Sequence, residues 1–86
     1  MNPQHRRIRI MLNSMAPKRA VDYIKSFGLR PDEESVLIEC DVNGLSYVQV
    51  SEKLHLSPDA IKERKRRAYS KIADEINNKR EQGADK

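Results

Sequence analysis

The densest chemistry in this chain is a run of positive charge between residues 62 and 71. Six of these ten residues are Lys or Arg, and Glu63 is the one acid among them. Long cationic side chains hydrogen-bond phosphate oxygens and the edges of bases, whereas a charge run in isolation is as often a solvated helix face. The run therefore predicts binding of an anionic polymer only if the fold projects these side chains from one exposed surface.

Formal charge alternates along the chain in three blocks. Residues 1–30 carry six net positive charges, residues 31–56 five net negative ones and residues 57–86 three net positive ones, within a total of +4. This order is typical of a chain whose two ends contact an anionic partner. We therefore predict that Arg6, Arg7 and Arg9 form a basic arm that reaches the backbone or the minor groove of DNA.

The elements that must position these charges are predicted to be helices. Hydrophobic residues recur at spacings of three and four, as in Ala20, Tyr23, Ile24 and Phe27. Three Gly, one Phe and no Trp argue against a β-rich fold with many tight turns. The sequence predicts an all-α fold of about five helices, the last of them long and beginning at Pro58.

Start signals of two successive helices mark a helix-turn-helix motif at residues 45–72. Ser46, with Gln49 three residues later, forms a capping-box pattern. Ser57-Pro58-Asp59 joins a capping hydroxyl to a proline at the first helical position and an acid near the positive end of the helix dipole. The apolar side chains expected to meet in the angle between the helices are Val50, Leu54, Leu56 and Ile61. This wedge fixes the second helix with its opposite face outward.

The outward face of that second helix carries long polar side chains. Lys62, Arg66 and Arg67 are expected to carry most of the contact with double-stranded DNA. Asp59 and Glu63 are expected to tune base choice by accepting hydrogen bonds from cytosine amino groups. Hydroxyl and N–H groups at the N-termini of the two helices favour phosphate contact.

Residues 29–76 resemble a known family. The shared patterns are a leucine-proline-acid start (Leu29-Arg30-Pro31-Asp32-Glu33), an NGLSY turn at 43–47, and the segments VSEKLHLS at 50–57 and AIKERKRRA at 60–68. These resemble the fourth region of bacterial sigma factors and the related LuxR-type response-regulator domains. In that family the second helix of the motif enters the major groove, which by position implicates Pro58, Asp59, Lys62, Glu63 and Arg66.

Two positions depart from the family pattern. His55 stands where the turn usually has Gly, which implies a left-handed backbone at a residue with a side chain. Lys65 stands where a buried Leu is usual. Its aliphatic stem either lies along the apolar surface while its charge reaches water, or makes the helix packing looser there. The full predicted set of DNA-binding residues is Ser46, Ser57, Pro58, Asp59, Lys62, Glu63, Lys65, Arg66, Arg67 and Lys71.

The predicted function is sequence-specific binding of double-stranded DNA by a transcriptional regulator. Because 86 residues are too few for a complete sigma factor of the usual kind, a phage, plasmid or mobile-element regulator is expected. The alternative is a protein-binding adaptor that docks on RNA polymerase or another regulator. The seam of Tyr69, Ile72, Ala73 and Ile76 serves either the monomer core or a homodimer, and the dimer is slightly favoured.

Other function classes find little support in the residue types. Two His and one Cys at unrelated spacings make no zinc site, and the chain has neither a Gly-rich phosphate loop nor a nucleophile with its base and acid. We expect no enzyme activity, no cofactor and no metal. Cys40 has no partner for an internal disulfide, which favours the reducing cytoplasm. No apolar run approaches the roughly 18–20 residues of a membrane span.

The expected organisation has three parts. Residues 1–16 form a basic arm or short helix, residues 17–80 the helix-turn-helix domain, and residues 81–86 a flexible tail.

Overall fold

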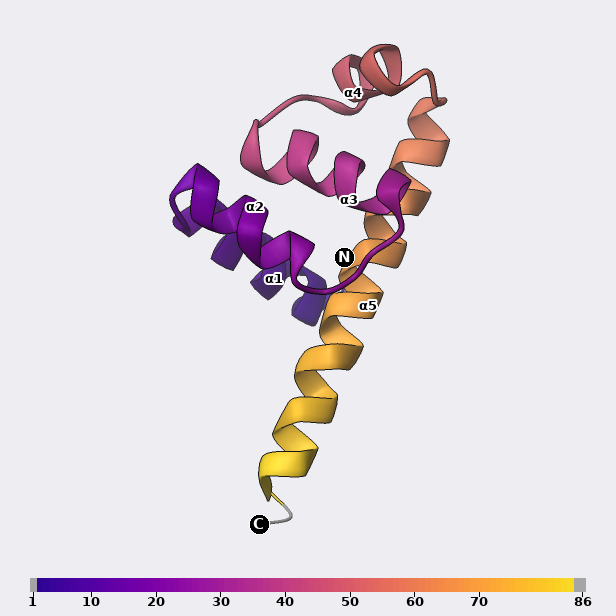
Figure 1. Ribbon diagram of the computed structural model, residues 1–86. Coiled ribbons are helices and arrows are strands. Elements are labelled where there is room, and N and C mark those ends of the chain that lie inside the picture. The colour runs from indigo at the N-terminus through magenta and orange to yellow at the C-terminus, as the bar shows by residue number, and fades with distance from the viewer. Residues whose placement is uncertain (1, 85–86) are drawn as a thin grey trace.

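The polypeptide between residues 2 and 84 folds into helices arranged along one long helix (Figure 1). This computed structural model describes residues 2–84, and the side chains of residues 2–78. The helices are α1 (Pro3–Ser14), α2 (Pro17–Lys25), α3 (Pro31–Leu37), α4 (Tyr47–Leu54) and α5 (Pro58–Ala84). Helix α3 continues into a π-helical turn, η1 (Ile38–Val42). The predicted all-α fold of five helices is confirmed.

Local sequence signals place the helix boundaries. Proline occupies the first position of α1, α2, α3 and α5, where its missing N–H costs no hydrogen bond. Gly28 and Gly44 take left-handed backbone, with φ of +64° and +71°, at the bends that follow α2 and η1. Asn2 caps α1, because its Oδ1 accepts a hydrogen bond from the Gln4 N–H at 2.8 Å.

Helix α5 packs against α1, α3 and α4 and joins two apolar clusters. The larger cluster is built from α1, α2, α3 and the middle of α5, and the smaller one fills the angle between α4 and α5. Figure 1 shows the other helices gathered beside the first half of α5, while its C-terminal part extends beyond them.

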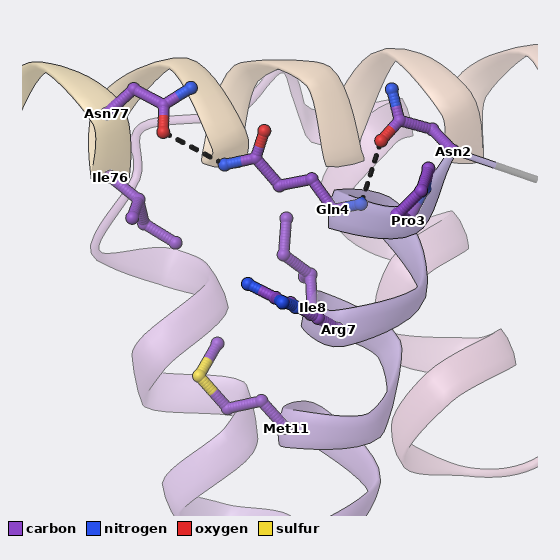
Figure 2. Close-up of a pocket in the computed structure, with 8 residues that line it drawn as sticks. All are labelled: Asn2, Pro3, Gln4, Arg7, Ile8, Met11, Ile76 and Asn77. Carbon is purple, nitrogen blue, oxygen red and sulfur yellow. Dashed lines mark hydrogen bonds between the residues drawn. The ribbon is translucent and has the colours of Figure 1, made fainter.

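The first helix belongs to the core. Ile8 and Leu12 of α1 are buried and pack in the same cluster as Tyr69 and Ile72. Figure 2 shows the open edge of this contact, where Gln4 Nε2 donates to Asn77 Oδ1 at 3.0 Å. Residues 3–14 are therefore a packed helix, which is the short-helix alternative of the two predicted for residues 1–16.

The apolar seam of α5 is used inside the chain. Tyr69, Ile72 and Ala73 are buried in the larger cluster, and Ile76 is half-buried against it. The seam thus serves the monomer core, the other of its two predicted roles, with α1 packed against it; a homodimer stays a prediction. Of the predicted tail at 81–86, residues 81–84 belong to α5, and Asp85 and Lys86 lie outside the described residues.

Candidate nucleic-acid interface

Helices α4 and α5 form a helix-turn-helix whose ends are capped as predicted. At the start of α4, Ser46 Oγ accepts from the Gln49 N–H at 3.2 Å, and the Ser46 N–H donates to Gln49 Oε1 at 2.9 Å. At the start of α5, Ser57 Oγ accepts from the Ala60 N–H at 3.1 Å. These bonds satisfy orphan donors at both N-termini and fix where each helix begins.

The turn between the two helices depends on a left-handed residue. His55 ends α4 with φ of 57° and ψ of 39°, which confirms the left-handed backbone predicted there. Its N–H donates to the Ser51 carbonyl, and so does that of Leu56 at 3.2 Å. The Ser51 hydroxyl donates to the Leu56 carbonyl. Ser51 is therefore small enough for the turn to form, and its hydroxyl stabilises the turn by a hydrogen bond.

The predicted apolar wedge sets the direction of α5. Val50, Ile61 and Val36 are fully buried together, and Leu54 and Leu56 pack against them. Because α3 contributes Val36, the angle between α4 and α5 is supported from behind. This packing leaves the opposite side of α5 exposed, which is the requirement for a recognition helix.

Charged side chains occupy that exposed side. Lys62 is exposed, and the side chains of Arg66 and Arg67 are 63% and 49% exposed. Glu63 accepts from Arg66 Nη2 at 2.8 Å and from Arg67 Nε at 3.1 Å. The hydrogen bond from Arg66, together with the charges of both guanidinium groups, lowers the pKa of the Glu63 carboxyl. The carboxylate therefore stays ionised as an acceptor between two arginines. Pro58 and Asp59 are exposed in the first turn of the same helix.

Lys65 lies in the core rather than on this face. It is 8% exposed, and its Nζ lies 3.3 Å from Asp41 Oδ1 and 5.4 Å from the centre of the Tyr47 ring. The Tyr69 hydroxyl donates to the other oxygen of Asp41. Burial, followed by this hydrogen bond to Asp41, raises the pKa of the Tyr69 hydroxyl, which therefore stays a donor. The charge of Lys65 is thus engaged inside the fold, and we leave it out of the contacts proposed below.

Lys71 faces α3 instead of the exposed stripe. Its Nζ donates to Glu33 Oε1 at 2.7 Å, and Glu33 is 1% exposed. Arg64, on the same side of α5, donates from Nε to Asp32 Oδ2 at 2.7 Å. These two ion pairs tie α5 to the start of α3, so Lys71 has a structural partner and lies apart from Lys62.

The three arginines of α1 do not act as one group. Arg9 lines a hollow together with Ser46 and Tyr47 at the start of α4. Arg7 lines a different pocket, between α1 and α5, that also contains Ile8, Met11 and Ile76 (Figure 2). Arg6 is exposed. The structure therefore brings one of the three, Arg9, to the helix-turn-helix.

Two residues at this surface were not foreseen from the sequence. His5 Nε2 lies 3.4 Å from Ser70 Oγ, and the His5 ring lies 5.5 Å from that of Tyr69. Tyr47 places its ring 5.7 Å from Lys62 Nζ. The start of α1 could have been found from Asn2-Pro3, a capping residue before a proline, but nothing local indicates that this helix returns to α5.

Comparison with known proteins places the motif in a family. The profile described as "Sigma-70, region 4" matches residues 28–72, slightly more than half of the chain. The chain belongs to the sigma-70 region 4 family. No curated protein and no solved structure matches it significantly.

The region 4 match extends from the residue before Leu29 to the middle of α5 and contains the whole helix-turn-helix. A region 4 domain is a DNA-binding element of transcription regulation rather than a catalytic one. This role agrees with the capped helix-turn-helix motif and with the basic outward face of α5. Helices α1 and α2 lie outside the match. The likeness to LuxR-type domains stays a prediction.

Within residues 2–84 no helix has the length and apolar character needed to cross a membrane. Nor does this part bring together three His, Cys, Asp or Glu side chains in a group that could hold a metal ion.

Proposed function

We propose that this region 4 domain is a sequence-specific, double-stranded DNA-binding regulator of transcription. The observation that carries the proposal is the exposed stripe of Lys62, Arg66 and Arg67 on the part of α5 that the wedge holds outward. In helix-turn-helix proteins the N-terminal part of the second helix contacts base edges in the major groove. Such a regulator acts on DNA in the cytoplasm.

Base choice is assigned to the first turns of α5. Arg66 and Arg67 present guanidinium groups that suit the O6 and N7 acceptors of guanine, and Asp59 and Glu63 accept from cytosine amino groups. In the free protein Glu63 holds both arginines. Exposed pairs of this kind contribute little free energy, so the arginines exchange Glu63 for bases at small cost. Pro58 starts the helix without a donor and sets its entry angle.

Phosphate contacts are assigned to the ends of the two helices and to α1. The hydroxyls of Ser46 and Ser57 accept hydrogen bonds from N–H groups as caps, and a hydroxyl that accepts retains its hydrogen for donation to a phosphate. Arg9 lies beside Ser46 and adds positive charge there. These groups position the protein without reading sequence.

The deciding experiment is a titration of a labelled random-sequence duplex, followed by fluorescence anisotropy at two salt concentrations. Binding that weakens steeply with salt supports phosphate neutralisation, with a slope of roughly 0.9 per neutralised phosphate. Selection from a random pool then identifies the preferred site. Absence of binding even at low salt contradicts the proposal.

A second candidate function is docking on RNA polymerase or another regulator. Membership in the sigma-70 region 4 family favours it, as does the acidic block at 31–56, which suits a basic protein surface. A pull-down with purified core polymerase tests it, and loss of the complex on adding competitor duplex would assign both partners to one face. Service of a phage, plasmid or mobile element stays a prediction, tested by the genes that flank its own.

A further inference from the structure

A groove of about 430 Å³ lies beside the proposed base-reading stripe. Its walls come from three helices: His5 from the first turn of α1, Tyr47 from the start of α4, and Lys62, Arg66 and Ser70 from α5. Two of these helices belong to the region 4 match, whereas α1 lies outside it. The groove therefore joins the helix-turn-helix to a part of the chain for which the family gives no role.

The lining of this groove suits an anion. It contains the cations Lys62, Lys65 and Arg66, and none of its lining residues is acidic. Asp41 neutralises Lys65 from beneath, and Glu63 pairs with Arg66, so the charge directed at an occupant is chiefly that of Lys62. The Ser70 hydroxyl and the His5 ring add neutral groups that can donate hydrogen bonds. Phosphate oxygens are acceptors that match this set.

The position of the groove along α5 indicates which anion would reach it. Lys62, Arg66 and Ser70 follow one another at intervals of four residues and share one side of the helix. From Pro58 to Arg66 a helix rises about 12 Å, which is also roughly the width of the major groove of B-DNA. When the first turns of α5, as far as Arg66, lie among the bases, Ser70 one turn further along therefore lies at the level of the flanking sugar–phosphate backbone.

We propose that this groove binds a backbone phosphate of the duplex, with His5 and Ser70 as hydrogen-bond donors beside the charge of Lys62. The inference rests on the proposed DNA binding and adds a second contact from α1 to the one proposed for Arg9. It also gives His5, which the base-reading face does not use, a ligand.

Proton uptake distinguishes this contact from an ordinary surface charge. His5 faces Arg66, Lys62, Lys65 and Tyr69 of α5 and Tyr47 of α4, together with Ser70. Burial, and then the charge of Arg66, lowers the pKa of His5 in the free protein, so its ring is neutral at pH 7. A phosphate in the groove favours the imidazolium form. DNA binding is therefore coupled to proton uptake at this ring, and affinity rises as the pH falls from the pKa of His5 in the complex toward its lowered pKa in the free protein.

The test is a set of anisotropy titrations with the same random-sequence duplex at constant ionic strength, from about pH 8 down to about pH 5.5. The wild-type chain is expected to bind about five- to tenfold more tightly at the lower pH. His5→Gln, which keeps a donor but cannot gain charge, should lose this increase and lie within about twofold of wild type at the higher pH. His55→Asn is the matched control, since it removes the other histidine and tolerates the left-handed turn; it should keep the increase.

Two further readings separate the contact from a loss of structure. Far-UV circular dichroism at each pH verifies that each variant is folded. Ser70→Ala removes the second donor without a charge change and should weaken binding about two- to fourfold at both pH values. The salt slope of His5→Gln at the lower pH should fall by about 0.9 relative to wild type.

The outcomes distinguish this inference from the function on which it rests. A wild-type chain that binds DNA with a pH response retained in His5→Gln overturns the phosphate groove and leaves DNA binding intact. A wild-type affinity that does not change with pH has the same meaning. A chain that binds no duplex at low salt overturns both.

Discussion

Replacement of Asp41 by Asn tests how the buried cation of this fold is held. Lys65 and Asp41 pair at 3.3 Å with side chains that are 10% and 2% exposed. Asn keeps an acceptor for the Tyr69 hydroxyl and removes the charge. The substitution therefore isolates the contribution of the charge pair with Lys65 to the free energy of unfolding. Breaking a buried pair by removing one partner costs about 3–5 kcal/mol, because a charge is left uncompensated. We expect Asp41→Asn to lower the free energy of unfolding by about 3 kcal/mol.

The magnitude is large for a domain of this size. At roughly 0.05–0.15 kcal/mol per residue, a chain of 86 residues has a total stability of about 4–13 kcal/mol. Urea unfolding followed by far-UV circular dichroism measures the difference, with the two-state assumption verified by a second probe. The double variant Asp41→Asn with Lys65→Met also removes the cation. It should recover most of the loss, because a buried pair replaced by apolar groups is often neutral.

Two results would refute this reasoning. A loss below about 1 kcal/mol in Asp41→Asn would mean that Lys65 reaches water by another path and needs no partner. Failure of the double variant to recover stability would mean that Asp41 acts through packing or through Tyr69 instead of through charge. Either result would mean that the Lys65–Asp41 ion pair does not stabilise the core.

Three further predictions concern the DNA face, α1 and the acid response. Arg66→Ala should weaken binding to the selected site by about 1–3 kcal/mol and relax one base preference, whereas Lys25→Ala on α2 should change affinity little; an equal loss for every sequence would make Arg66 a phosphate contact. Ile8→Ala should lower the free energy of unfolding by about 2–5 kcal/mol, because Ile8 is 2% exposed, and an unchanged urea midpoint would restore the view of residues 1–16 as an arm. Hydrogen bonds from Lys53 and Asn43 lower the pKa of Glu39 below its ordinary value of 4.5, so its contribution to stability is present above that pH and is lost as the pH falls through the lowered value. Urea midpoints from about pH 7 to pH 3 should therefore converge for wild type and Glu39→Gln at the acid end, and a constant difference would contradict the shift.

The motif was predictable because its signals are local. The capping box at Ser46, the capping hydroxyl of Ser57 and the prolines at first helical positions each depend on residues within one turn of each other. The left-handed backbone at His55 followed instead from the family pattern. The wedge followed from apolar residues on both sides of the predicted turn, Val50 and Leu54 before it and Ile61 after it. Such signals fix where helices begin and which faces are apolar, and these parts of the prediction agree with the structure.

The arrangement of distant segments was less accessible. The sequence shows Ile8 and Leu12 as an apolar pair. Their contact with Tyr69 joins residues far apart in the chain, and no pattern of neighbouring residues indicates it. The position of Lys65 in a place usual for Leu did signal a buried cation. That signal did not identify the counter-charge, which Asp41 supplies from a π-helical turn. For the same reason His5 and Tyr47 were missed, since each becomes part of the interface only through packing.

The continuity of α5 has a mechanical consequence. Its 27 residues form one helix, about 40 Å long, whose first turns carry the proposed base contacts and whose last turns extend beyond the other helices (Figure 1). A change of about 10° in the tilt of this helix in the major groove displaces its far end by roughly 7 Å over that length. Two DNA sequences that seat the first turns at slightly different angles would thus hold the far end of α5 at different places, as a lever converts a small rotation into a larger travel.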